Sequence, residues 1–389
     1  MNPRFPNRRE CIAAGSALML TVPGSFQLKQ LGSPASPPSV DGMSHQGIQP
    51  MPTHSIIPIT GDGRWVSRDP PHETGLLEPR EYEVRIGIEA TGRISARNFV
   101  ATTVAPIEHP EQKILDVRVE QDGCAASVQN LSETAAQLVV SAPLIADKQA
   151  IHGEAIYRIR LCKTHWGYTR DRFPEKQTVS KELARQYLND SPGIEIRLAK
   201  LRKIVEEASL ASKHPWDLAN AFYQWVHTNI EGVPMNYTSV KRAIETLRGD
   251  CEERAGVFVA LCRTAGIPAR LVWLPNHVWA EFLLVDESGQ SHWIPAHTAA
   301  YTWFGWTGVH ELVLQKGDKI KQAGMDKYVR LVSDWWQYEG TKPNLRFTAS
   351  ITPLPTEPQT DPGPGARQKQ PAGQWKLVGT NPDQRYMRD

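Results

Sequence analysis

The 389-residue chain has little net charge, few cysteines and no long hydrophobic run. Its 44 basic and 42 acidic side chains nearly cancel, and no block of like charge forms an arm, so nothing in the charge pattern favours nucleic-acid binding. No segment is apolar over the roughly 20 residues that a membrane-spanning helix needs. Closely spaced pairs of Cys or His ligands are also missing, which argues against a zinc site.

The amino terminus carries an arginine pair followed by an apolar stretch. Arg8 and Arg9 precede apolar and small residues from Ile12 to about Val22, a stretch too short to span a bilayer. Residues 1–25 therefore resemble a twin-arginine export signal, and we expect an exported protein, periplasmic or extracellular. Cys11 lies in this segment without a leucine three residues before it, so a lipid anchor is not expected.

Composition divides the rest of the chain into a linker, two folded regions and a tail. Residues 26–75 are rich in Pro and Ser, which is typical of a linker that buries no core. Residues 76–165 are expected to form a small antiparallel β-sandwich, and residues 178–349 an α+β domain. Residues 350–389, rich in Pro, Gln and Gly, are expected to be a disordered tail. The strands expected in the sandwich are 82–89, 100–106, 115–120, 137–141 and 155–161.

The second folded region begins with helical periodicity. Apolar residues recur at helical spacing over 194–208 and over 218–230, and Pro215 suits the first turn of the second of these helices. A short third helix over 243–247 leads to Gly249.

The clearest chemical signal is a cysteine at the start of the next helix. Gly249 and Asp250 suit a tight turn and a helix cap, which places Cys251 in the first turn. Unpaired backbone N–H groups and the helix dipole stabilise a thiolate there, and the thiolate is the attacking form of cysteine. Cys262 lies on the buried face of this helix as an ordinary core residue, and Gly266 ends it.

A histidine opens a strand soon after this helix. Residues 269–273 are expected as one strand, 277–285 as a second and 291–296 as a third, with a hairpin at 286–289. His277, Trp279 and Glu281 share one face of the second strand. A histidine in this place can act as base or ion-pair partner for a nucleophilic thiol.

The segment from Ala243 to His297 resembles the transglutaminase-like family of papain-type thiol enzymes. The resemblance rests on the helix-capping Cys251, on the stretch LCRTAGIPAR that ends at Arg270, and on the H-x-W-x-E pattern that starts at His277. It implies a papain-like α+β fold with Cys251 as nucleophile and His277 as its base. That family normally carries a third site residue, an Asp in a W-x-x-x-D context, and His297 occupies this position here.

His297 changes what the third position can supply. A carboxylate there orients the catalytic imidazole and stabilises its charged form, and replacing it by an amide costs about 10⁴ in rate in a serine triad. A neutral imidazole can accept a hydrogen bond from His277 but supplies no negative charge.

We therefore expect a thiol enzyme with the catalytic residues Cys251, His277 and His297, acting on an amide carbonyl of a protein or peptide. Water as the second substrate would make it a protease or amidase, and an amine would make it a crosslinking enzyme. No cofactor and no metal are expected. Two alternatives are an inactive binding module of the same fold and a zinc site formed by Cys251, His277 and His297.

Several other residues have simpler interpretations. Glu252, Glu253 and Arg254 are expected as a solvated first turn of the cysteine helix. Cys124 and Cys162 are the pair left for a disulfide once the export segment and the cysteine helix are set aside. Tyr237 lies where that family often has an aromatic side chain near the oxyanion site, although core packing explains it equally well. One further aromatic group either lines a cleft or forms core, namely Trp279, Trp293, Trp303, Phe304 and Trp306.

Overall fold

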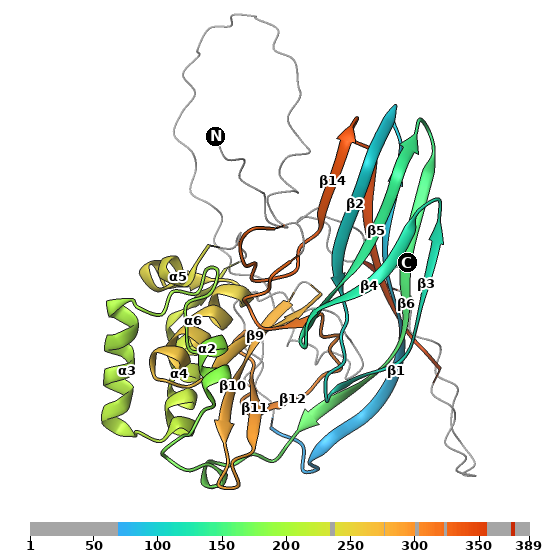
Figure 1. Ribbon diagram of the computed structural model, residues 1–389. Helices are drawn as coiled ribbons and strands as arrows, with labels where there is room; N and C mark the ends of the chain where they lie inside the picture. Colours follow the sequence, from blue (N-terminus) through green and yellow to red (C-terminus); the bar gives the residue numbers. More distant parts are fainter. Residues whose placement is uncertain are drawn as a thin grey trace, which may run out of the picture.

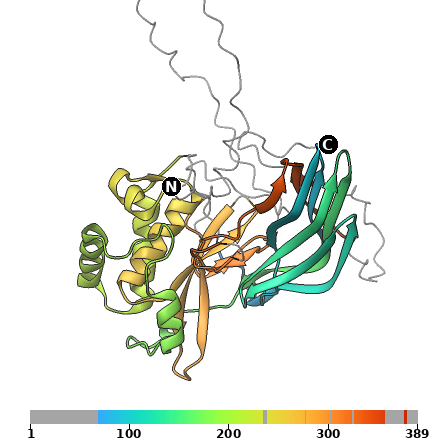
Figure 2. The same cartoon turned by 45° about the horizontal axis from the view of Figure 1, so that its top comes forward.

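The computed structural model describes residues 69–233, 238–275, 277–299, 303–322 and 325–355, and the backbone of a short strand at 375–377. The expected export signal, most of the expected linker and Tyr237 lie outside the described residues. Strands of a β-sandwich lie on one side and helices on the other, with β9, β10 and β11 between them (Figure 1 and Figure 2).

All five strands expected in the sandwich are present; four lie within longer strands, and the one expected at 100–106 runs one residue past the end of β2. Alternate residues of β1 are buried, from Tyr82 to Ala90, because one face of the strand packs on the core between the two sheets. One strand of this region, β4, was not expected from the sequence. The strands are β1 (Gly75–Thr91), β2 (Ser95–Ala105), β3 (Gln112–Asp122), β4 (Ala125–Ser132), β5 (Ala135–Ala146) and β6 (Ala150–His165).

The end of the described chain returns to this sandwich. β14 (Trp335–Gly340) pairs with β2, and β15 (Asn344–Pro353) pairs with β1 over its whole length, while β16 (Trp375–Leu377) pairs with β15. The boundary expected between residues 349 and 350 therefore falls inside β15. Local sequence patterns do not reveal a partner so distant in the chain, so the sequence analysis placed residues 335–349 in the α+β domain and residues 350–353 in the tail.

The helical side is built around one buried helix. α3 (Ala199–Ala211), α4 (Pro215–Asn229) and α5 (Val240–Thr246) contact α6 (Cys251–Thr264), which is buried along all but its last residue. A helix that is buried on every side forms the centre of a domain. The smaller elements on this side are η1 (Arg170–Arg172), α2 (Lys181–Tyr187) and the parallel pair β7 (Glu231–Gly232) and β8 (Arg248–Gly249).

α6 packs against the antiparallel strands β9 (Ala269–Leu274) and β10 (His277–Val285), and β11 (Ser291–Ala296) follows on the other side of β10. β12 (Trp306–Thr307) pairs with β6, and β13 (Gln315–Lys316) pairs with both β9 and β5. One sheet therefore runs from β11 through β13 into the sandwich, in the order β11-β10-β9-β13-β5-β2-β14. The expected α+β class is confirmed, and its two regions share a sheet.

Cys124 and Cys162, the one pair considered for a disulfide, are both thiols. The thiol of Cys124 donates to the carbonyl of His152 at 3.1 Å, whereas Cys162 lies ten residues further along β6. Ten residues of strand span about 33 Å, and a disulfide needs Cα atoms within about 7 Å.

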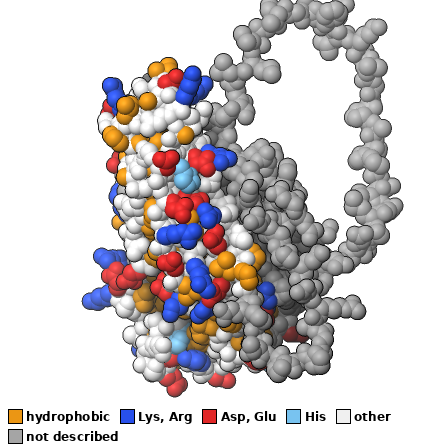
Figure 3. Space-filling view, turned by 90° about the vertical axis from the view of Figure 1, so that its right-hand side faces the viewer, with side chains coloured by type: hydrophobic (Ala, Val, Ile, Leu, Met, Phe, Trp, Pro, Cys, Tyr) orange, Lys and Arg blue, Asp and Glu red, His pale blue; other side chains and the backbone are white. Residues whose placement is uncertain are grey.

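The outer sandwich face carries interspersed charges of both signs (Figure 3). Arg158 and Arg160 on β6 both pair with Glu81 on β1, and Arg85 pairs with Glu154. Within the described ranges, no helix is long and apolar enough to cross a membrane.

Candidate active site

Cys251 is the first residue of α6, as predicted, and is 6% exposed. Asp250 caps the helix by accepting the N–H of Glu252 at 2.8 Å. Glu253 completes a capping box, since its carboxylate accepts the N–H of Asp250 at 3.1 Å. A Cβ at Gly249 would lie 2.4 Å from the Cβ of Glu253, so only glycine lets the chain approach the helix this closely. The thiol is therefore held at a rigid helix N-terminus.

The expectation that the first turn of this helix is solvated was wrong, because Glu252, Glu253 and Arg254 are all buried. Each finds a polar partner inside the fold. Glu253 also accepts the backbone N–H of Thr238 at 2.7 Å, Glu252 pairs with Arg330 at 2.7 Å, and Arg254 donates to the carbonyl of Ile230 at 3.1 Å. Burial, and then the adjacent Asp250 carboxylate, raise the pKa of Glu253. Sequence analysis missed these contacts because their partners lie in distant loops.

His277 is the first residue of β10 and is 2% exposed. Strand alternation places it on the face of Trp279, as predicted, while residues 278, 280 and 282 pack in the core that contains α6. Within the described part of the chain, neither ring nitrogen of His277 makes a hydrogen bond. The structure thus places the thiol and this imidazole on packed neighbouring elements without a hydrogen bond between them.

The protonation state of His277 follows from its surroundings. Burial, and then the nearby His297 ring, lower the pKa of His277 to about 3. The ring is neutral at neutral pH, so it can accept a proton from a thiol but does not form an imidazolium that would stabilise a thiolate in advance. The helix N-terminus still favours a thiolate at Cys251 in this form.

His297 lies beside His277, immediately after β11, and is fully buried. The two rings are stacked, with centroids 5.8 Å apart and planes at 27°. Trp279 stacks on His297 at 5.0 Å and Trp303 contacts it edge-on at 5.1 Å, while the backbone N–H of His297 donates to the carbonyl of Trp303 at 2.9 Å. The imidazole is therefore held firmly, but by stacking rather than by a hydrogen bond from His277.

Glu311 is the functional candidate that sequence analysis missed. Its Oε2 lies 3.4 Å from Nε2 of His297. One ligand atom each of His277, His297 and Glu311 lies within 4.8 Å of the other two, so this group could also hold a metal ion. Glu311 lies in a loop after β12, and no pattern in the sequence connects it with Cys251 or His277.

The expected aromatic group divides into two. Trp279 and Trp303 pack on His297, and Trp306 packs on Trp303 at 5.0 Å. Phe304 instead packs in the helical core against Phe282, and Trp293 lies under the guanidinium of Arg270 at 3.8 Å.

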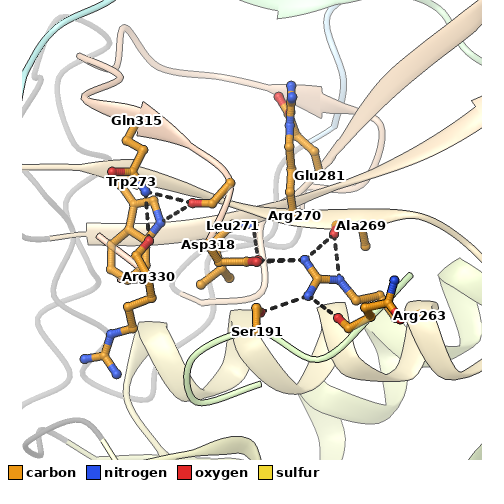
Figure 4. Close-up of polar contacts among 12 residues, drawn as sticks. Ser191, Arg263, Ala269, Arg270, Leu271, Trp273, Glu281, Gln315, Asp318 and Arg330 are labelled. Carbon is orange, nitrogen blue, oxygen red and sulfur yellow. Dashed lines mark hydrogen bonds and ion pairs between the residues drawn. The ribbon is translucent and has the colours of Figure 1, made fainter. Parts of the chain in front are cut away.

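Both arginines of the LCRTAGIPAR stretch have structural partners (Figure 4). Arg263 binds both carboxylate oxygens of Asp318, at 2.9 and 2.8 Å, and donates to the carbonyl of Ala269. Arg270 pairs with Glu281 at 2.7 Å, and Lys316 pairs with the other oxygen of Glu281 at 2.6 Å. Burial would raise the pKa of Glu281, but the two cations lower it to about 2. These contacts fix α6, β9 and β10 to β13.

Part of the chain is similar to a known protein family. Residues 202–298 match the model of the transglutaminase-like superfamily. No curated protein sequence matches the chain. Among solved structures, one described as a "putative cysteine protease" from Cytophaga hutchinsonii is 15% identical with a TM-score of 0.48, over 72% of this chain and 92% of that one. A "putative protease" from Parabacteroides distasonis is 11% identical with a TM-score of 0.23, over 57% of this chain and 44% of that one.

The matched range contains α6, β10 and β11 with Cys251, His277 and His297, and it ends before Glu311. Residues 202–298 are therefore similar to the transglutaminase-like superfamily, within a chain of α+β fold.

Proposed function

We propose that this protein is a thiol enzyme that attacks an amide carbonyl of a protein or peptide. The observation that carries the proposal is Cys251 at the first position of a capped, buried helix that packs against the strand opened by His277. The thiol would attack the carbonyl carbon, and His277 would take its proton and pass it to the leaving amine. A backbone N–H near Cys251 would help to hold the oxyanion. The product of this half-reaction is a thioester, which water or an amine resolves.

The neutral state of His277 favours general-base activation over a preformed ion pair. In this scheme His277 takes the thiol proton when the substrate is bound, and its ring must turn to form a hydrogen bond with the thiol. Catalytic hydrogen bonds are often absent or long before substrate binds. His297 and Glu311 act as positioning residues: Glu311 holds His297, and His297 supports the ring of His277 by stacking.

Water is the second substrate that we propose, which makes the enzyme a protease or amidase. The test uses purified protein with a fluorogenic peptide-amide library, and in parallel a glutamine-bearing protein with a fluorescent primary amine. Hydrolysis that is lost in Cys251→Ala and in His277→Gln supports the proposal, with Cys262→Ala as the matched control. Amine incorporation without hydrolysis would instead identify a crosslinking enzyme.

Two observations favour the second candidate, an inactive binding module of this fold. His277 makes no hydrogen bond to any described residue, and the third site position holds His297 in place of a carboxylate. A folded protein without turnover and with a slow, ordinary thiol at Cys251 would establish that alternative.

We also propose that the protein is exported through its twin-arginine segment. The double variant Arg8→Lys with Arg9→Lys should leave the precursor in the cytoplasm, because lysine does not reproduce the recognition of the arginine pair. Normal secretion of that variant with an unchanged mature terminus would show that another signal directs export.

A further inference from the structure

His277, His297 and Glu311 bring two imidazoles and one carboxylate together from three segments. One ligand atom of each lies within 4.8 Å of those of the other two. Both imidazoles are buried, and the Glu311 side chain is 11% exposed. The group contains no cysteine, so it differs from the Cys251, His277 and His297 zinc site considered from the sequence.

The two ring nitrogens of His277 strengthen the case for a ligand. Neither makes a hydrogen bond to a described residue, although the side chain is almost wholly buried. Buried polar atoms nearly always have a partner, and an ion or a water commonly explains those that lack one in the protein itself. One lone-pair nitrogen from each of two imidazoles, next to a carboxylate, is a combination that favours a cation.

We propose that His277, His297 and Glu311 form a binding site for one Zn²⁺ ion, with a water as fourth ligand. Two His and one Glu with an open position form a known zinc ligand set, with ligand distances of about 2.0–2.2 Å. Such distances need only a small inward movement of side chains whose donor atoms already lie within 4.8 Å of one another. The stacked Trp279 and edge-on Trp303 hold His297 and exclude water around the ion.

Zinc at this site would inhibit the enzyme. Coordination consumes a lone pair of His277 and fixes its ring, so the ring no longer accepts the Cys251 proton. This consequence rests on the proposed function, whereas metal binding itself does not. The site would therefore make turnover of the protein sensitive to zinc.

The test measures binding and activity separately on the full chain after dialysis against a chelator. Co²⁺ is titrated by calorimetry and by visible absorption, and Zn²⁺ is then used to displace it. One equivalent should bind, with the d–d bands of a four-coordinate ion and no thiolate-to-cobalt charge-transfer band. Glu311→Gln and His297→Gln should each weaken binding at least ~10-fold, the lower end of what even a supporting partner contributes. Cys251→Ala and His292→Gln should bind as the wild type does, since His292 is a buried histidine that pairs with Asp286 instead.

The outcomes separate the two proposals. Failure to bind one equivalent, equal binding by Glu311→Gln and His297→Gln in folded protein, or loss of binding in Cys251→Ala would each overturn the zinc site. Thermal melting identifies a variant that fails to fold. If either Glu311→Gln or His297→Gln fails to fold, metal binding by the other variant tests the site. An active, metal-free enzyme that binds no Co²⁺ leaves the proposed function standing. A protein that binds one Co²⁺ but is inactive without metal leaves the site standing and removes the proposed function.

Discussion

Glu311 Oε2 lies 3.4 Å from Nε2 of His297, and the two side chains are 11% and 0% exposed. An ionised carboxylate only accepts hydrogen bonds, so the imidazole donates through Nε2. This contact sets the tautomer of His297. It also brings a carboxylate into the site, although His297 occupies the position where the transglutaminase-like family normally has an Asp. The nearby Glu311 carboxylate is a physical reason why a histidine can occupy that position.

Glu311→Gln is the first test of that relationship. On the proposed mechanism, turnover should fall by about 10- to 100-fold, because His297 loses its anionic partner and the rings shift, and misplacement by about 1 Å has costs of this order. The KM value should change little, and a chelator is present throughout. The exposed Glu287→Gln is the matched control. Unchanged turnover in Glu311→Gln would show that the carboxylate does not position the site.

Thiol reactivity should distinguish Cys251 from Cys262. Burial raises the pKa of Cys262 well above that of a free thiol, whereas Cys251 lies at the helix N-terminus where the dipole favours thiolate. Iodoacetamide at neutral pH should label Cys251 at least about 10-fold faster, as measured by peptide mass spectrometry, and the order should persist in Cys124→Ser with Cys162→Ser. Equal labelling of both helix cysteines would contradict this assignment.

Local sequence patterns predicted the elements, because capping and periodicity act over a few residues. Asp250 caps α6, Gly266 has the positive φ of 80° that suits a helix end, and β9 and β10 lie where alternation and breakers indicated. What local patterns could not predict was pairing over long distances. β15 completes a sheet with β1, and two residues of β13 join the sandwich to the helical side.

The candidate site shows the same limit. Cys251 and His277 were found because a helix start and a strand start are visible in the sequence. Glu253 and Arg254 were expected in solvent because charge alone suggests exposure, and their buried partners Thr238 and Ile230 come from other segments. Glu311 has no local signal at all, since its importance depends on a loop that returns to His297.

Gly249→Ala should loosen the start of α6. The new Cβ would stand 2.4 Å from the Cβ of Glu253, so the capping box must shift. We expect a loss of about 1–3 kcal/mol in the free energy of unfolding, the usual cost of overpacking, together with slower labelling of Cys251. Gly256→Ala in the same helix is the matched control, because its Cβ would meet only a side-chain methyl of Val240 at 3.3 Å. Equal stability of the two variants would show that the tight approach at Gly249 is unimportant.

His277 should make the folded protein less stable as the pH falls. Burial, and then His297, lower its pKa from 6.5 to about 3 in the folded state. Between these values the unfolded chain binds a proton that the folded protein excludes, so stability falls as the pH drops from about 6.5 towards 3. His277→Gln removes this pH dependence. As the pH falls across that window, the stability of the variant relative to the wild type should therefore increase by up to about 1.4 kcal/mol per pH unit. Urea unfolding of both proteins with chelator present measures the difference, and curves that stay parallel from pH 7 to 4 would mean that the buried ring takes up its proton as readily in the folded state as in the unfolded chain.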